Sequence, residues 1–173
     1  MLGFYEGFPE NSIHRRDLYS STLPVRKLQQ RLMEAFREVN RKTFSFEEVG
    51  NPAVPDSVVI FELGIADSAD FHYIDDETAQ KVADAIALKP MRMMDLFCSI
   101  RYYKNSANGK KKPLKFDYYM VRWAFGEDST VELQIYHERG PRYLSPEDLA
   151  VFLTKRINKG SPKPVLNALE PAF

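Results

Sequence analysis

The stretch of residues 96–138, LFCSIRYYKNSANGKKKPLKFDYYMVRWAFGEDSTVELQIYHE, decides the fold class. It contains three runs in which apolar and polar residues alternate, namely Leu96–Tyr103, Leu114–Phe125 and Thr130–Glu138. Alternation with a period of two is typical of strands that bury one face. The polar loop Asn105–Pro113 and the turn Gly126–Ser129 separate the runs, so the sequence predicts an antiparallel meander of three strands.

The alternation also assigns the side chains of the meander to faces. On the first strand, one face carries Leu96, Cys98, Ile100 and Tyr102. On the second strand, one face carries Phe116, Tyr118 and Met120, and the other carries Tyr119, Val121, Trp123 and Phe125. On the third strand, the residues that face inward are Val131, Leu133, Ile135 and His137. The 12 Phe and 9 Tyr residues of the chain are therefore expected to dominate the core.

Three helices and two further strands are predicted outside the meander. One helix is amphipathic, with Thr22 as its N-cap and Pro24 near its first turn, and its apolar stripe extends to Val39. Asp75 and Ser145 are good N-caps for the other two, which end at Lys89-Pro90 and at Gly160. The run Val58–Ile65 reads as a buried strand, and Ile13–Ser21 shows a weaker strand pattern.

These elements give the order (β)αβαβββα. The order predicts an α+β fold, with a mostly antiparallel sheet of about 4–5 strands and helices packed on one face. We expect residues 1–160 to form a single domain and residues 161–173 to form an extended C-terminal tail. The apolar residues of that tail, Val165, Leu166, Leu169 and Phe173, could dock on this domain or on a second copy, which would make the protein a homo-oligomer.

Composition restricts the cellular setting. Cys98 is the only cysteine, which excludes an internal disulfide and favours a reducing compartment. Residues 1–10 lack the features of a signal peptide, and no window approaches the roughly 18 apolar residues of a membrane span. We therefore expect a soluble cytoplasmic protein that has no membrane partner.

Charge is balanced overall but unevenly distributed. The 24 basic and 24 acidic residues cancel, so net charge gives no argument for nucleic acid. Residues 14–42 carry a net +5, residues 47–89 a net −8 and residues 91–125 a net +6. Opposed blocks of this kind either pair with one another in the fold, which is the simpler interpretation, or form a charged binding face.

A lysine-rich loop is the first candidate site. Five lysines, Lys104, Lys110, Lys111, Lys112 and Lys115, lie between strands that are rich in Tyr and Phe. Lysines that contact phosphates beside rings that stack on bases are typical of RNA-binding surfaces, and Arg15 and Arg16 could join the same patch. The alternative is a solvated hairpin loop above rings that fill a core.

A second candidate is an anion site at the end of the meander. His137, Arg139 and Arg142 precede the capped helix start at Ser145, and helix N-termini attract anions. The alternative for His137 is a hydrogen-bonded core residue. The acidic stretch Glu62, Asp67, Asp70, His72, Asp75 and Asp76 suggests a metal site less strongly, because a helix start and a solvated loop account for it.

The sequence contains no Rossmann glycine motif, P-loop, zinc-protease motif or nucleophile elbow, and we expect no cofactor and no bound metal. The leading hypothesis is an intracellular, non-enzymatic binding or assembly module for a macromolecular partner, either protein or RNA. The alternative is an enzyme that binds a small molecule or an anion in a pocket between the sheet and the last helix.

Overall fold

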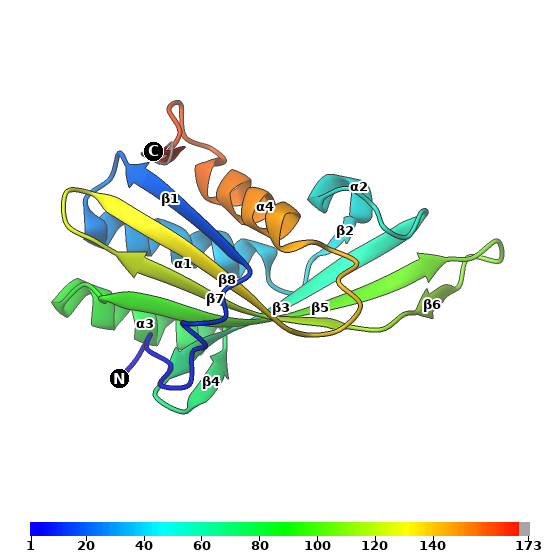
Figure 1. The fold of residues 1–173 in the computed structure, drawn as a ribbon, viewed down its shortest axis with the longest axis horizontal. Helices are drawn as coiled ribbons and strands as arrows, with labels where there is room; N and C mark the ends of the chain where they lie inside the picture. Colours follow the sequence, from blue (N-terminus) through cyan, green and yellow to red (C-terminus); the bar gives the residue numbers. More distant parts are fainter. Residues whose placement is uncertain (170–173) are drawn as a thin grey trace.

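A curved antiparallel sheet organises the chain (Figure 1). The structure is a computed structural model, and it describes residues 1–169. The strands are β1 (Arg15–Ser21), β2 (Thr43–Ser45), β3 (Ser57–Asp67), β4 (Asp70–Tyr73), β5 (Met93–Asn105), β6 (Lys111–Pro113), β7 (Asp117–Phe125), β8 (Thr130–Arg139) and β9 (Leu166–Ala168). The helices are α1 (Val25–Val39), α2 (Phe46–Val49), α3 (Asp76–Leu88) and α4 (Pro146–Asn158).

The sheet is open and consists of nine strands within the described residues. Its main path is β2-β3-β5-β7-β8-β1-β9, with β4 paired to β3 and β6 paired to β5. Every pair of strands is antiparallel. The predicted meander is confirmed as β5, β7 and β8, because each of these strands is long enough for its alternating pattern to be read in the sequence.

The predicted architecture of about four to five strands with helices on one face is wrong, although the class remains α+β. Strands β2, β4, β6 and β9 are only three or four residues long, so they show no readable alternation. They form because a longer neighbour offers unpaired backbone groups, as when Lys111–Pro113 pairs with β5 inside the segment predicted as a loop. The predicted order (β)αβαβββα also lacks α2.

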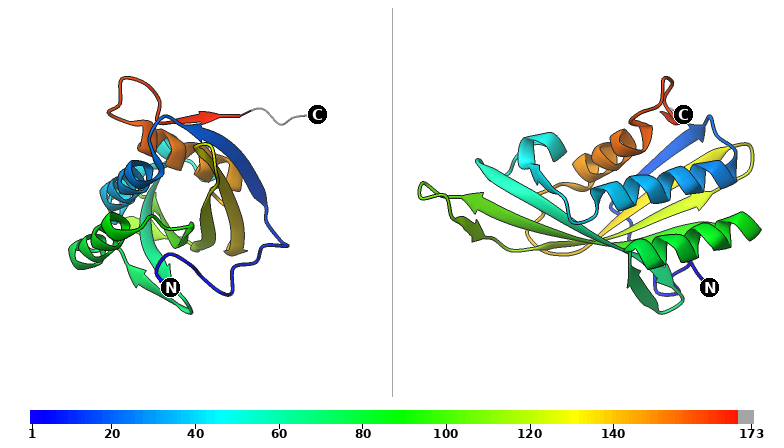
Figure 2. Two further views of the ribbon diagram at one scale, coloured as in Figure 1. Left: turned by 90° about the vertical axis from the view of Figure 1, so that its left-hand side faces the viewer. Right: turned by 180° about the vertical axis from the view of Figure 1, so that it is seen from behind.

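The helices form a row rather than a simple layer on the sheet. Helices α1 and α4 lie within the curve of the sheet, whereas α3 packs against α1 and α2 against α4 (Figure 2). Two arginines of α1 bind neighbouring helix ends: Arg26 donates to the Ile86 carbonyl, and Arg31 donates to the carbonyls of Arg156, Ile157 and Lys159. These bonds satisfy carbonyls that a helix C-terminus leaves unpaired.

The predicted caps are confirmed for two helices and wrong for one. Asp75 accepts a bond from the Thr78 N–H, and Ser145 accepts one from the Asp148 N–H. Thr22 does not cap α1, whose N-cap is Pro24, with no side-chain capping bond. The hydroxyl of Thr22 is instead turned toward the carbonyls of residues 164 and 165 in the C-terminal segment.

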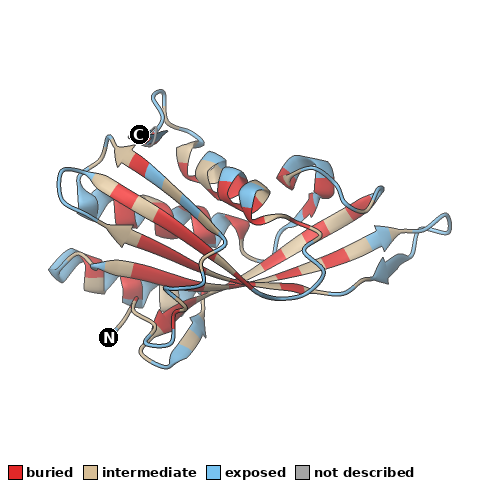
Figure 3. Cartoon of the chain, viewed as in Figure 1, coloured by how far each residue is buried: buried red, intermediate tan, exposed pale blue. Residues whose placement is uncertain are grey.

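The core lies between the concave face of the sheet and the helices (Figure 3). On β5 and β8 the residues predicted to share one face are buried, and on β7 the buried face is the one that carries Tyr119 and Trp123. Val165 and Leu166 of the predicted tail are also buried in this chain's own core, and β9 pairs with β1. Phe173 lies outside the described residues, and oligomer formation stays a prediction.

Pairs of opposite charge join the basic and acidic blocks of the sequence. Arg37 pairs with Asp76, and Arg101 pairs with Glu62, so both basic blocks contact the acidic one. Within residues 1–169, no helix is long and apolar enough to cross a membrane.

Candidate functional site

The convex face of the sheet, opposite α1 and α4, carries a continuous row of aromatic rings. We call Phe71, Phe97, Tyr118 and Phe116 the ring row. Its ring centroids are 5.5 Å apart for Phe71 and Phe97, 5.8 Å for Phe97 and Tyr118, and 6.1 Å for Tyr118 and Phe116. All four residues are only partly buried. Rings in the core are fully enclosed by contrast, as Tyr119 and Trp123 are.

Two arginines lie against one end of the ring row. The guanidinium carbon of Arg139 is 4.5 Å from the centroid of Tyr118, and that of Arg101 is 5.9 Å from the centroid of Phe116. A bulge in β8 positions Arg139: Tyr119 is opposite His137, but Tyr118 is opposite Arg139. The extra residue reverses the alternation, so Arg139 reaches the convex face while His137 points inward.

A hollow lies where the ring row ends. It has a volume of about 540 Å³ and is lined by Lys115, Phe116, Tyr118, Arg139 and the Gly140-Pro141 segment. Arg139 and Lys115 form no ion pair with an acidic residue of the described chain. The hollow thus combines two free cations with two partly exposed rings.

The structure separates the basic residues of the first candidate site. Lys104 is directly opposite Lys112 on the face that continues from buried Tyr102, whereas Lys111 is opposite Asn105 and therefore on the other face. Lys110 lies at the tip of the β5–β6 hairpin, and only Lys115 lines the hollow. Arg15 and Arg16 lie on β1, separated from β5 by β7 and β8, and bind Asp17 and Glu132.

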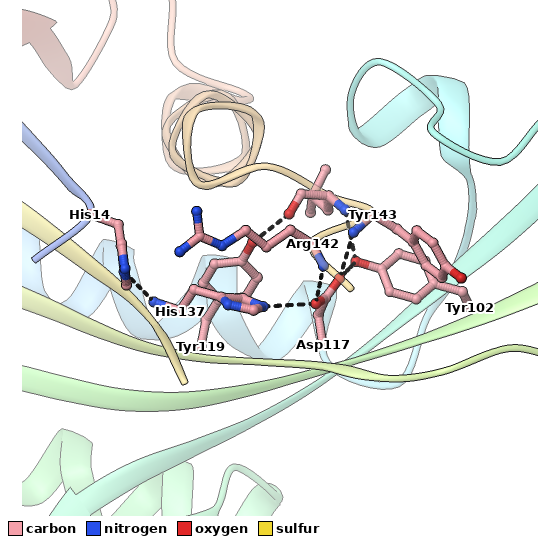
Figure 4. Close-up of polar contacts among 8 residues, drawn as sticks. His14, Tyr102, Asp117, Tyr119, His137, Arg142 and Tyr143 are labelled. Carbon is pink, nitrogen blue, oxygen red and sulfur yellow. Dashed lines mark hydrogen bonds and ion pairs between the residues drawn. The ribbon is translucent and has the colours of Figure 1, made fainter. Parts of the chain in front are cut away.

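The residues of the predicted anion site are also divided, and a buried carboxylate organises two of them (Figure 4). Asp117 is fully buried and accepts four hydrogen bonds. Its Oδ1 accepts from His137 Nε2 at 2.9 Å and from the Arg142 N–H at 2.7 Å. Its Oδ2 accepts from the Tyr102 hydroxyl at 2.6 Å and from the Tyr143 N–H at 2.9 Å.

This network attaches the segment of residues 140–144 to the concave face. Tyr102 also accepts from the Leu144 N–H, and Tyr119 donates to the Leu144 carbonyl. Burial and the adjacent Asp117 carboxylate raise the pKa values of both tyrosines, so they act as neutral donors. Since the oxygens of Asp117 are fully used, we interpret the network as structural.

Gly140 permits this attachment. Its φ is +117°, and a Cβ there would collide with the Phe116 carbonyl oxygen and lie 2.8 Å from the Asp117 Cα.

The Arg142 side chain extends above Tyr119 toward His14 (Figure 4). His14 accepts a bond from the His137 N–H on its Nδ1, and partial desolvation, then Arg142 and His137, lower its pKa.

A second buried charge cluster fixes the N-terminal segment to the sheet. Arg122 donates from Nε and Nη2 to the two Asp95 oxygens at 2.7 and 2.8 Å, and from Nη1 to Glu10 at 2.6 Å. Asp95 also accepts from the Tyr5 N–H at 2.7 Å. Phe8 lies 4.2 Å below the Arg122 guanidinium. The cluster therefore covers part of the convex face beside the ring row.

Sequence reasoning missed Asp95, Asp117 and Arg122 as organising residues. The available signal was a charged residue inside an alternating strand, and for Asp117 at an inward position.

The acidic stretch is dispersed: Glu62 binds Arg101, Asp75 caps α3, and Asp76 binds Arg37. Among residues 1–169, no group of three or more His, Cys, Asp or Glu side chains is placed to hold a metal ion.

Comparison with models of protein families, with curated proteins and with solved structures finds no match for this chain. The geometry of the convex face and of the two buried networks is therefore the basis for assigning a function.

Proposed function

We propose that the chain is a non-enzymatic binding module whose convex face takes single-stranded RNA. One observation carries the proposal: Lys115 and Arg139 line the same hollow as Phe116 and Tyr118, at the end of the ring row. Surfaces that bind single strands combine rings for base stacking with cations for the phosphate backbone. On this sheet both groups occupy one face.

The spacing of the ring row supports this assignment. Neighbouring ring centroids are 5.5 to 6.1 Å apart, so successive rings offer separate stacking surfaces to the unstacked bases of one RNA strand. These stacking surfaces are fixed, because Phe71, Phe97 and Tyr118 lie on the paired strands β4, β5 and β7, and Phe116 directly precedes β7. A protein partner would also bury the rings, but free cations at the hollow favour a polyanion.

The direct test is fluorescence anisotropy with a labelled 12-nucleotide oligouridine RNA at about 20 and 150 mM salt, where a salt-dependent affinity reports phosphate contacts. Tyr118→Ala should weaken binding by about 5-fold to 150-fold, which corresponds to the loss of one stacked base. Lys115→Ala with Arg139→Ala should flatten the salt slope by about 1.4, since each single-strand phosphate contact contributes about 0.7.

The matched control is Lys104→Ala with Lys112→Ala, which removes two charges from the opposite face. This double substitution should weaken RNA binding less than the double substitution of Lys115 and Arg139 does. Absence of binding at low salt would refute the proposal. The proposal would also be refuted if the affinity fell in the Lys115 and Arg139 variant but not in Tyr118→Ala, because bases would then not stack on the ring row. Stable capture of a protein on the intact face, with no RNA affinity, would replace RNA by a protein partner.

A further inference from the structure

A second cavity lies away from the ring row, between the N-terminal segment, the end of α3 and the start of β5. Its volume is about 530 Å³, which is within the range of small-molecule pockets. Apolar side chains form most of its wall, among them Leu2, Phe4, Ala85, Met91 and Met93. Methionines adapt their shape to flexible apolar ligands more readily than branched side chains.

The walls of this cavity are held by the protein itself. Gly3 donates to the Ala66 carbonyl at 2.7 Å and accepts from the Asp95 N–H at 2.7 Å, which fixes the N-terminal wall. The amide of buried Gln29 holds the opposite wall: it donates to the Met91 carbonyl at 2.7 Å and accepts from the Met91 N–H at 2.9 Å. A ligand would therefore enter a largely preformed space.

The charges on the cavity are of one sign. Lys89 and Arg92 both line it, and neither forms an ion pair with an acidic residue within residues 1–169. An apolar cavity flanked by two cations complements a ligand with an apolar body and one anionic head group. A cationic amphiphile has the same body but the wrong charge.

We propose that this cavity binds an amphipathic carboxylate of medium chain length, with its chain against Met91 and Met93 and its carboxylate at Lys89 and Arg92. The cavity shares no lining residue with the ring row or its hollow, so failure of RNA binding leaves this inference intact.

The experiment is NMR of the full chain with ¹³C-labelled methionine methyl groups, titrated with decanoate below its micelle concentration. The chain has six methionines, of which Met1, Met91 and Met93 line the cavity. Met33 is buried in the core and Met120 lies on the convex face, so both serve as internal controls. Decanoate should shift the Met91 and Met93 signals in a saturable way and leave Met33 and Met120 unchanged.

Three further measurements separate the parts of the inference. Lys89→Ala with Arg92→Ala should weaken decanoate binding by at least about tenfold but leave decan-1-ol binding unchanged. Lys27→Ala, an exposed cation on α1, should change neither. Ala85→Trp places an indole in the cavity and should abolish binding of both ligands.

Absence of saturable shifts at Met91 and Met93 would overturn the inference. Equal affinity for decyltrimethylammonium would overturn the assignment of an anionic ligand, as would decanoate binding that the Lys89 and Arg92 variant does not weaken. Binding that persists in a folded Ala85→Trp protein would show that the ligand lies elsewhere.

Discussion

Replacing Asp117 by asparagine is the sharpest test of the buried network. The carboxylate accepts four hydrogen bonds, two on each oxygen. An asparagine keeps one acceptor oxygen and turns an NH₂ group toward the other two donors, whichever way the amide is rotated. Hydrogen bonds to a charged acceptor contribute about 1.5–3 kcal/mol each, and the neutral amide is less costly to bury, so we expect Asp117→Asn to destabilise the fold by about 3–4 kcal/mol.

Urea unfolding measures this loss directly, because Trp123 is the only tryptophan and is fully buried. A loss of that size lowers the melting temperature by roughly 10 °C in a chain of this length. Asp70→Asn, an exposed carboxylate on β4, is the matched control and should lie within about 0.5 kcal/mol of the parent. If Asp117→Asn were destabilised by less than about 1 kcal/mol, the network would not anchor the segment of residues 140–144.

Three other outcomes follow from the same geometry. Gly140→Ala should cost more than about 3 kcal/mol in urea unfolding, because its Cβ meets backbone atoms, whereas Gly109→Ala, with a positive φ but open space, should cost about 1 kcal/mol. Burial raises the pKa of the Cys98 thiol, so iodoacetamide should modify it slowly at pH 8 in the native protein and rapidly in urea; fast native labelling would contradict its placement. Partial desolvation and the nearby Arg142 lower the pKa of the exposed His14 from its usual 6.5, so Arg142→Ala should raise it in an NMR titration. Because the folded state favours the neutral ring, His14 supports stability above pH 6.5 and loses that contribution as the pH falls through its lowered pKa; an unchanged pKa in the variant would remove Arg142 as a cause.

The candidate site was only partly visible in the sequence. The period-two pattern around Phe116 and Tyr118 correctly separated the convex rings from the buried Tyr119, and the lysine-rich loop suggested a polyanion nearby. Arg139 was assigned to an anion site with His137, because nothing in one sequence marks the bulge that turns Arg139 to the convex face. The cavity beside Met91 joins residues 1–4 to residues 85–93, so no local pattern contains it.

The sequence by itself determined the long elements of this protein: the three-stranded meander, α1, α3 and α4, and the caps at Asp75 and Ser145. These depend on interactions between residues close in the chain, which leave a readable period or a fixed spacing. Only the tertiary structure decided the short strands β2, β4, β6 and β9, the row of helices inside a curved sheet, and the four bonds at Asp117. Each of these depends on backbone or side-chain groups that distant segments bring together, as Asp117 does with Tyr102 and Tyr143, and such partners leave no periodic signal in the sequence.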